Sequence, residues 1–227
     1  QKELYHAHAQ RLALMLQNQT EEEFADSRFQ VLSELTRLRQ LCCDPALVYE
    51  NYEGGSAKLD LCIELIQSAV ESGHKILLFS QFTSMIEILT ARLQEESISC
   101  FVLQGSTKKE QRAQMVEQFN RDDTSVFCIS LKAGGTGLNL TGADIVIHYD
   151  PWWNVAVENQ ATDRAHRIGQ KNVVTVYKLI AKGTIEEKII KLQQMKKELA
   201  EEILSGDEIK TASFQREELL ELLEERF

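Results

Sequence analysis

A glycine-rich segment has residue types that could bind phosphate. It is KAGGTGLNL, residues 132–140, and its glycines let a backbone approach a phosphate and direct several N–H groups toward it. The segment is not a Walker A loop, since Gly-Lys-Ser and Gly-Lys-Thr are absent from the sequence. Nor is it Gly-x-Gly-x-x-Gly, because Leu140 stands in place of the third glycine. It is therefore a phosphate loop or a flexible connection, and a dinucleotide fold is disfavoured.

Two arginines could bind the same kind of group. Gln160, Arg164 and Arg167 are spaced i, i+4 and i+7, which puts them on one face if residues 154–166 form a helix. Guanidinium groups bind phosphate oxygens in bidentate geometry, so this pair could neutralise charge on a transferred phosphoryl group. A solvated basic face paired with nearby acidic residues has the same spacing.

Two adjacent indoles form a third group, in DPWWN at 150–154. One ring could pack under a sheet while the other presents its face to a base or sugar. Core packing of both rings is the alternative.

These groups follow runs of apolar residues that predict strands. Because the runs are apolar at consecutive positions, they predict a parallel sheet buried on both faces, in an open α/β fold whose carboxyl edge binds ligands. Gly73 is expected to close a helix over 57–72, and capping boxes are expected at 107–110 and 184–187. His148, in a predicted buried strand, is expected to be structural, and His166 is assigned no role. The predicted strands are 75–80, 99–103, 125–130, 144–149 and 173–179.

The hydrophobic pattern divides the chain into three regions. Residues 1–57 are a helical segment, ended by Asp44-Pro45, and a linker; residues 58–181 are the α/β domain; residues 182–227 are C-terminal helices. The chain begins in a helical pattern without Met, so we expect it to be a piece of a longer protein.

Charge and cysteine content narrow the function classes. The 227 residues carry a net charge of −10, which argues against a protein whose whole surface binds nucleic acid. Residues 58–180 are nearly neutral, with 12 basic and 14 acidic residues, and could form a local basic groove. The five cysteines include no Cys-x-x-Cys pair, which predicts buried, reduced thiols and no metal site. No secretion signal and no run of about 18–20 apolar residues occurs.

In this order, the three groups resemble the second lobe of the Swi/Snf family of DNA-dependent ATPases, in helicase superfamily two. The resemblance rests on SLKAGGTGLNLTGADIVIHYDPWWN at 130–154 and QATDRAHRIGQ at 160–170. LLFSQFTSMIEIL at 77–89, LQGSTKKEQR at 103–112 and LTRLRQLCCDPAL at 35–47 extend it over nearly the whole chain. It implies a RecA-like open parallel sheet with helices on both faces and helical extensions at both ends.

The resemblance also implies roles for individual residues. Arg164 and Arg167, with Gln160 beside them, would reach ATP bound on the first lobe, and the helix from Thr184 would brace both lobes. Two departures, Val155 in place of a proline and Asp44-Pro45 in place of His-Pro, affect local geometry only. The loop that couples nucleotide to DNA would contain Gly135, Gly137 and Asn139, and the DNA-backbone contacts would come from Ser80, Gln81, Gly105, Ser106, Lys132 and Trp153.

The implied function is half of a remodeller-like motor that moves on double-stranded DNA. The sequence has neither a Walker A lysine nor a DExH pair, so ATP and Mg²⁺ would be held mainly by an N-terminal lobe of the same protein, and this chain alone would lack ATPase activity. We expect a monomer without membrane contact, located in the cytoplasm or nucleoid of a prokaryote or, less favoured, in a nucleus. The alternative is a non-enzymatic module that docks DNA or protein; an oxidoreductase is disfavoured by the missing third glycine.

Overall fold

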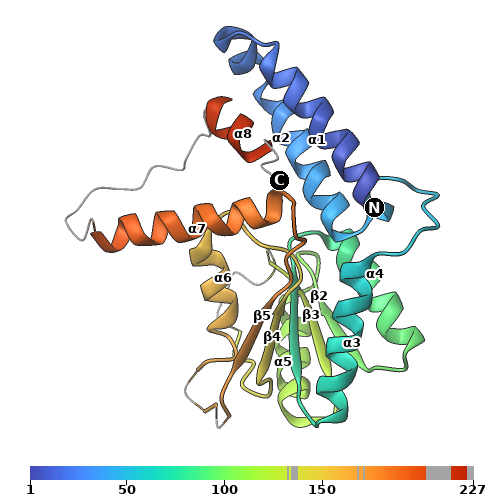
Figure 1. Cartoon of the computed structure of the whole chain (residues 1–227). Coiled ribbons are helices and arrows are strands. Elements are labelled where there is room, and N and C mark those ends of the chain that lie inside the picture. The colour runs from blue at the N-terminus through green and yellow to red at the C-terminus, as the bar shows by residue number, and fades with distance from the viewer. Residues whose placement is uncertain (132, 134–137, 168, 171, 203–215, 224–227) are drawn as a thin grey trace. The chain divides into compact units, whose positions relative to one another are not determined.

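The computed structural model describes the chain except residues 132, 134–137, 168, 171, 203–215 and 224–227 (Figure 1). It divides into two compact units. One is continuous, Ser56–Ile180; the other combines the two ends of the chain, Gln1–Gly55 and Ala181–Phe227. No helix in the described residues is both long enough and apolar enough to cross a membrane.

The unit Ser56–Ile180 is built on a five-stranded sheet in which every pair of neighbours is parallel, in the order β2-β3-β1-β4-β5 (Figure 1). The predicted open parallel α/β fold is therefore confirmed, and each strand lies inside its predicted run. The strands are β1 (Ile76–Ser80), β2 (Cys100–Leu103), β3 (Val126–Ser130), β4 (Ile145–His148) and β5 (Thr175–Lys178).

Helices cover both faces of the sheet. One face packs Leu77, Phe79 and Phe127 into a cluster with Phe119 of α5 and Ala161 of α6. On the other face the Cys128 thiol lies beside side chains of α3 and α4. The central strands β1, β3 and β4 are fully buried because both faces are covered, which is why their sequences are apolar without alternation. The helices are α3 (Ala57–Glu71), α4 (Thr83–Glu95), α5 (Lys109–Arg121) and α6 (Val155–Thr162).

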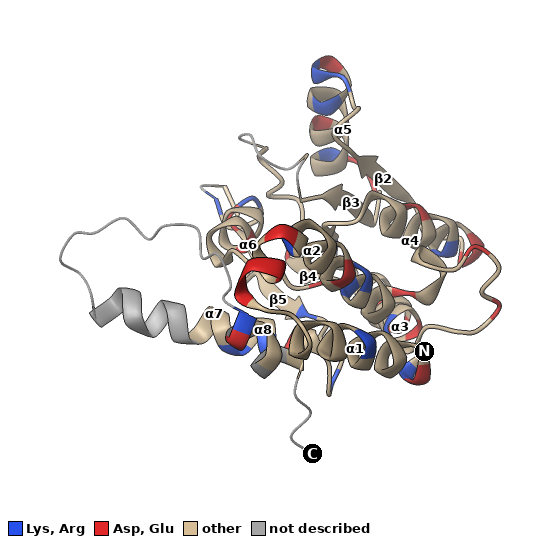
Figure 2. Cartoon of the chain, turned by 90° about the horizontal axis from the view of Figure 1, so that it is seen from above, with Lys and Arg blue, Asp and Glu red and all other residues tan. Residues whose placement is uncertain are grey.

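Local signals set some helix ends as predicted. The Ser56 hydroxyl accepts from the N–H of Leu59 at the start of α3, and Gly73, with a φ of +79°, ends that helix in the left-handed region. Asn154 caps α6 through a bond from the N–H of Ala156. Basic and acidic residues both lie along α5 (Figure 2), and most of its residues are exposed.

Two predicted helix ends are wrong. Thr107 does not cap α5, because its hydroxyl accepts from the N–H of Gln104 in the preceding turn; the helix begins two residues later. Helix α6 ends at Thr162 rather than near residue 166. In the turn that follows, the carbonyl of Arg164 accepts from the N–H of Leu140 at 3.1 Å.

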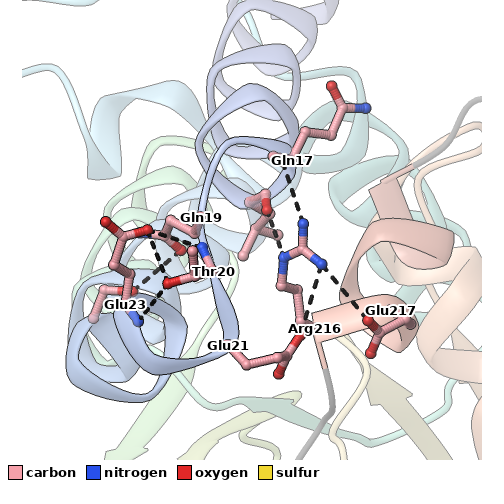
Figure 3. A network of polar contacts seen from close by, with 9 residues as sticks. Gln17, Gln19, Thr20, Glu21, Glu23, Arg216 and Glu217 are labelled. Carbon is pink, nitrogen blue, oxygen red and sulfur yellow. Dashed lines mark hydrogen bonds and ion pairs between the residues drawn. The ribbon is translucent and has the colours of Figure 1, made fainter.

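The second unit begins with a helical hairpin, α1 (Lys2–Gln17) and α2 (Glu21–Cys43). Thr20 and Glu23 form a complete capping box at the start of α2 (Figure 3). Asp44-Pro45 ends α2 as expected, because the Asp44 carboxylate caps the short 3-10 helix η1 (Pro45–Leu47) instead.

The C-terminal helix α7 (Ile185–Glu202) is joined to the hairpin through its first turn. The buried N–H of Ile185 donates to the Tyr5 hydroxyl at 2.7 Å. Thr184 caps the helix at the N–H of Glu186, as predicted, but the Glu187 carboxylate accepts from Gly183 rather than closing the box on Thr184.

Helix α8 (Arg216–Leu223) is held to the same hairpin by Arg216. Its guanidinium donates to the carbonyls of Leu16 at 2.7 Å and Gln17 at 3.2 Å, and it pairs with Glu21 and Glu217 (Figure 3). These carbonyls end α1 and lack partners within the helix, so Arg216 satisfies the C-terminus of α1, while its ion pair with Glu21 reaches the first residue of α2.

Candidate functional site

The predicted site residues follow the carboxyl ends of four neighbouring strands. Because all strands are parallel, these ends lie along one edge of the sheet. The register aligns Ser80 with Ser130 and Phe79 with His148, so the segments after β1, β3 and β4 begin side by side. Lys132, Gly135 and Gly137 lie outside the described residues.

A buried carboxylate, Asp150, joins two of these segments. It accepts a short hydrogen bond from the Ser80 hydroxyl and longer ones, at 3.3 and 3.4 Å, from the N–H of Gln81. The Ser80 hydroxyl also accepts from the N–H of Phe82, and the side chain is fully buried. Ser80 is thus committed to internal bonds that fix the loop after β1, whereas Gln81 is half-buried at its surface.

Arg112 of α5 shapes the loop after β2. Its guanidinium donates to the carbonyls of Gln104 and Gly105, at 3.2 and 3.0 Å, and to Ala133 after β3, at 3.2 Å. One side chain therefore ties two loops of the edge together and leaves Gly105 and Ser106 exposed. The sequence gives no periodic signal for this role.

The end of the glycine-rich segment is anchored on both sides. Asn120 donates to the carbonyl of Asn139 at 2.8 Å and accepts from the N–H of Gly142 at 2.9 Å. The next residue, Leu140, donates its N–H to the carbonyl of Arg164 at 3.1 Å. A displacement of the backbone at Leu140 would therefore act directly on the carbonyl of Arg164.

The arginines occupy contrasting environments. Arg164 is 3% exposed, and its Nε and Nη1 have no hydrogen-bond partner in the described part of the chain. Burial, and secondly the charge of Arg167, lower the pKa of the Arg164 guanidinium. Arg167 and Gln160 are exposed. Since α6 ends at Thr162, the predicted shared helical face is wrong, although the two guanidinium charges do lie close enough to interact.

Gln170 was not predicted to have a role, yet its side chain connects the turn that carries the two arginines to a distant part of the chain. Its Nε2 donates to the carbonyls of Thr141, Ala143 and Ala165, at 3.2, 2.6 and 3.3 Å. These bonds join the residues after the glycine-rich loop to the turn that carries the arginines. A lone glutamine after a glycine offers no sequence signal for such a junction.

The two tryptophans differ in their surroundings. Trp152 packs against the core cluster, and its backbone N–H donates at 2.7 Å to the buried carboxylate of Glu158. Lys178 of β5 neutralises that carboxylate at 2.7 Å. Trp153 is half-buried and lies outside the core cluster. The turn is thus held by an ion pair that the sequence spacing did not identify.

His148 sits in the interior of the unit. It stacks on Phe79, with ring centroids 5.5 Å apart, and its Nε2 lies 3.0 Å from the Thr162 hydroxyl. Burial lowers the pKa of His148 to about 4; Glu158 opposes this shift and Lys178 adds to it. The imidazole is therefore neutral at physiological pH.

The described residues contain no cluster of three or more His, Cys, Asp or Glu side chains that could hold a metal ion.

Comparison with known proteins identifies relatives of the chain. Residues 57–169 match the family described as Helicase conserved C-terminal domain. An uncharacterized ATP-dependent helicase of Mycoplasma pneumoniae is 45% identical over 202 residues, which cover 87% of this chain. The same alignment covers 19% of that relative, so the chain spans about a fifth of its length.

Two solved structures from Sulfolobus solfataricus have the same fold. The SWI2/SNF2 ATPase C-terminal domain matches with a TM-score of 0.72 and 32% identity, covering 91% of this chain and 85% of its own. The SWI2/SNF2 ATPase core in complex with dsDNA matches with a TM-score of 0.73 and 33% identity, covering 88% and 42% respectively.

The parallel sheet and the helicase match define the class of protein, a C-terminal lobe of the helicase type. Within that class the identity to the Sulfolobus domain is more specific: the chain belongs to the SWI2/SNF2 family. The resemblance seen in the sequence motifs, and the RecA-like fold that it implies, are confirmed.

Proposed function

We propose that this chain is the C-terminal motor lobe of an ATP-driven translocase that acts on double-stranded DNA. Residues 58–181 would form the motor lobe proper, with residues 1–57 leading into it and residues 182–227 bracing it. The family membership supports an ATP-dependent activity, and the related Sulfolobus ATPase core has been solved with dsDNA. The protein would be intracellular and monomeric.

The observation that carries this proposal is the environment of Arg164. A guanidinium that is buried with two nitrogens lacking a hydrogen-bond partner among the described residues pays a desolvation penalty, and an anion that supplies acceptors would offset it. The adjacent Arg167 is exposed and can reach outward. Together they would neutralise charge developing on the transferred phosphoryl group of ATP, with Gln160 beside them.

ATP and Mg²⁺ would be held mainly by an N-terminal lobe of the same protein. When bound there, the metal would supply positive charge to the phosphates, and the residues of this chain would contribute further positive charge and orientation. The glycine-rich loop, with Gly135, Gly137 and Asn139, would couple nucleotide to DNA. The bond from Leu140 to the carbonyl of Arg164 supports that coupling.

The carboxyl edge of the sheet would contact the DNA backbone through Gln81, Gly105, Ser106, Lys132 and Trp153. The exposure of Gly105 and Ser106 supports these roles, as does the buried Nε2 of Gln81, which has no hydrogen-bond partner in the part of the chain that the structure describes. Ser80 would not make the DNA-backbone contact that the family resemblance implies for it. Its hydroxyl bonds to Asp150, so it would position the loop rather than touch a phosphate.

The test compares this chain alone with a longer protein in which an N-terminal helicase lobe precedes it. We expect no appreciable ATP hydrolysis by the chain alone, and hydrolysis stimulated by double-stranded DNA in the two-lobed protein. Robust magnesium-dependent turnover by the chain alone would refute the division of labour. A two-lobed protein that binds DNA without hydrolysing ATP would favour a docking module.

A further inference from the structure

An open cavity of about 510 Å³ lies within the helical unit, apart from the residues of the proposed motor site. Side chains from both helices of the hairpin and from the segment after η1 line it. Those that the proposal uses are His8 and Arg11 of α1, Arg37 and Gln40 of α2, and Tyr49. A volume of this size lies in the range of small-molecule sites.

A buried carboxylate holds the basic side chains in place. Glu34 accepts at one oxygen, Oε1, from Arg11 Nη2 at 3.4 Å and from Arg37 Nη1 at 3.1 Å. The His8 ring lies 3.7 Å from its other oxygen. Because both guanidiniums bond to the same oxygen, they lie close enough together for one further anion to accept from both.

The guanidiniums keep donors for such an anion. Within the described residues, each of the two donates a single hydrogen bond, to Glu34, while a guanidinium carries five N–H groups. Their side chains remain 65% and 47% exposed at Arg11 and Arg37. Two positive charges against one carboxylate leave the cavity wall positive in a chain whose net charge is −10.

A second contact, between His8 and Tyr49, makes another part of the cavity lining rigid. His8 Nε2 and the Tyr49 hydroxyl are 2.8 Å apart, and the two rings meet edge to face with centroids 6.2 Å apart. This bond connects α1 to the segment after η1, so the wall is set before any ligand arrives. Preorganised donors lower the entropy cost of binding.

We propose that this cavity binds a phosphate group. Guanidiniums that converge from two helices, with the Gln40 amide beside them, suit an anion with several oxygens arranged around one atom. The carboxylate position between the arginines is already filled by Glu34. The phosphate could be inorganic, part of a nucleotide or part of a DNA backbone. The site does not depend on the proposed motor function.

The experiment records the side-chain ¹H–¹⁵N signals of the arginines in the whole chain. Inorganic phosphate, ATP without divalent cation and a short DNA duplex are added separately. We expect the Nε–H signals of Arg11 and Arg37 to shift and saturate with at least one of the three, which also identifies the source of the phosphate.

The variant Arg11→Gln should weaken that binding by about tenfold or more, since hydrogen bonds to charged groups contribute about 1.5–3 kcal/mol. It leaves Glu34 paired with Arg37, so the hairpin should stay folded, and the unfolding temperature checks this. Arg121→Gln removes one positive charge from an exposed position on α5 and should leave binding unchanged. The proposal is overturned if no probe saturates the signals, or if Arg11→Gln and Arg121→Gln bind alike. Neither result depends on ATP hydrolysis.

Discussion

Buried charged residues organise the carboxyl edge of the sheet. Asp150 bonds to the loop after β1, and Glu158 bonds to the tryptophan turn and to Lys178. Each carboxylate has its partners inside the unit, as buried charges require. Arg164 is different, because two of its nitrogens have no hydrogen-bond partner among the described residues. That contrast is why Arg164, and not the carboxylates, points to a ligand.

His148 should make folding stability depend on pH. Its pKa is about 4 in the folded chain and about 6.5 when unfolded, so between these values only the unfolded chain binds the proton. Above pH 6.5 the residue has no effect; as the pH falls toward 4, the free energy of unfolding should drop by up to about 1.4 kcal/mol per pH unit. Urea unfolding of wild type and His148→Gln from pH 7 to 4 tests this.

The variant removes the titrating group but keeps an amide that can reach Thr162. Its stability should therefore fall less steeply with acid than that of the wild type. Parallel curves for the two proteins would mean that His148 does not titrate differently on folding.

At the scale of elements, bonds made outside a helix accompany both wrong helix ends. Asn154 starts α6 as its sequence predicts, but the turn after the helix bonds elsewhere: the carbonyl of Arg164 accepts from Leu140, and that of Ala165 from Gln170. Leu140 comes from a distant segment, so no pattern within the helix reveals its bond. Thr107 differs, because its hydroxyl is used by the turn just before it.

The hydrogen bonds from Arg216 to the end of α1 should decide whether α8 stays packed against the helical hairpin (Figure 3). Arg216→Ala removes the donors to the carbonyls of Leu16 and Gln17, and should lower the stability of the helical unit by about 1–2 kcal/mol. Amide hydrogen exchange in α8 should accelerate with it. The measurement combines denaturant unfolding with exchange of residues 216–223.

Glu217→Ala provides the matched control, because this ion pair is 65% exposed on the glutamate side and surface pairs contribute little. It should leave both readouts nearly unchanged. If Arg216→Ala behaves like Glu217→Ala, the hydrogen bonds of Arg216 do not hold α8 against the hairpin.

At the scale of the whole molecule, periodicity predicted most of the architecture. The five apolar runs are the five parallel strands, but the predicted burial on both faces holds only for β1, β3 and β4. It is wrong for β2, which is mostly half-buried, and for β5, which is exposed. The joining of the two chain ends into one unit was not predicted. The polar contacts between the two ends, such as Ile185 with Tyr5 and Arg216 with Leu16, carry no repeat in the sequence.

The candidate site was predictable only in part. Motif resemblance placed its residues after the correct strands, yet the supporting contacts of Arg112, Asp150 and Gln170 appear only in three dimensions. Each of these side chains bonds to backbone or hydroxyl groups of a distant segment. Such bonds leave no trace in residue spacing.

The central claim is that this lobe supplies arginine charge to a nucleotide held elsewhere in the same protein. The most direct test is ATP turnover, with saturating double-stranded DNA, by a protein that carries both lobes, compared between wild type and Arg167→Ala. Removing an arginine finger should lower kcat on the order of 10³-fold, while ATP and DNA binding are retained. Arg121→Ala should turn over as wild type does. Equal turnover by Arg167→Ala and wild type would contradict the claim, and Arg167 would then be part of a solvated surface.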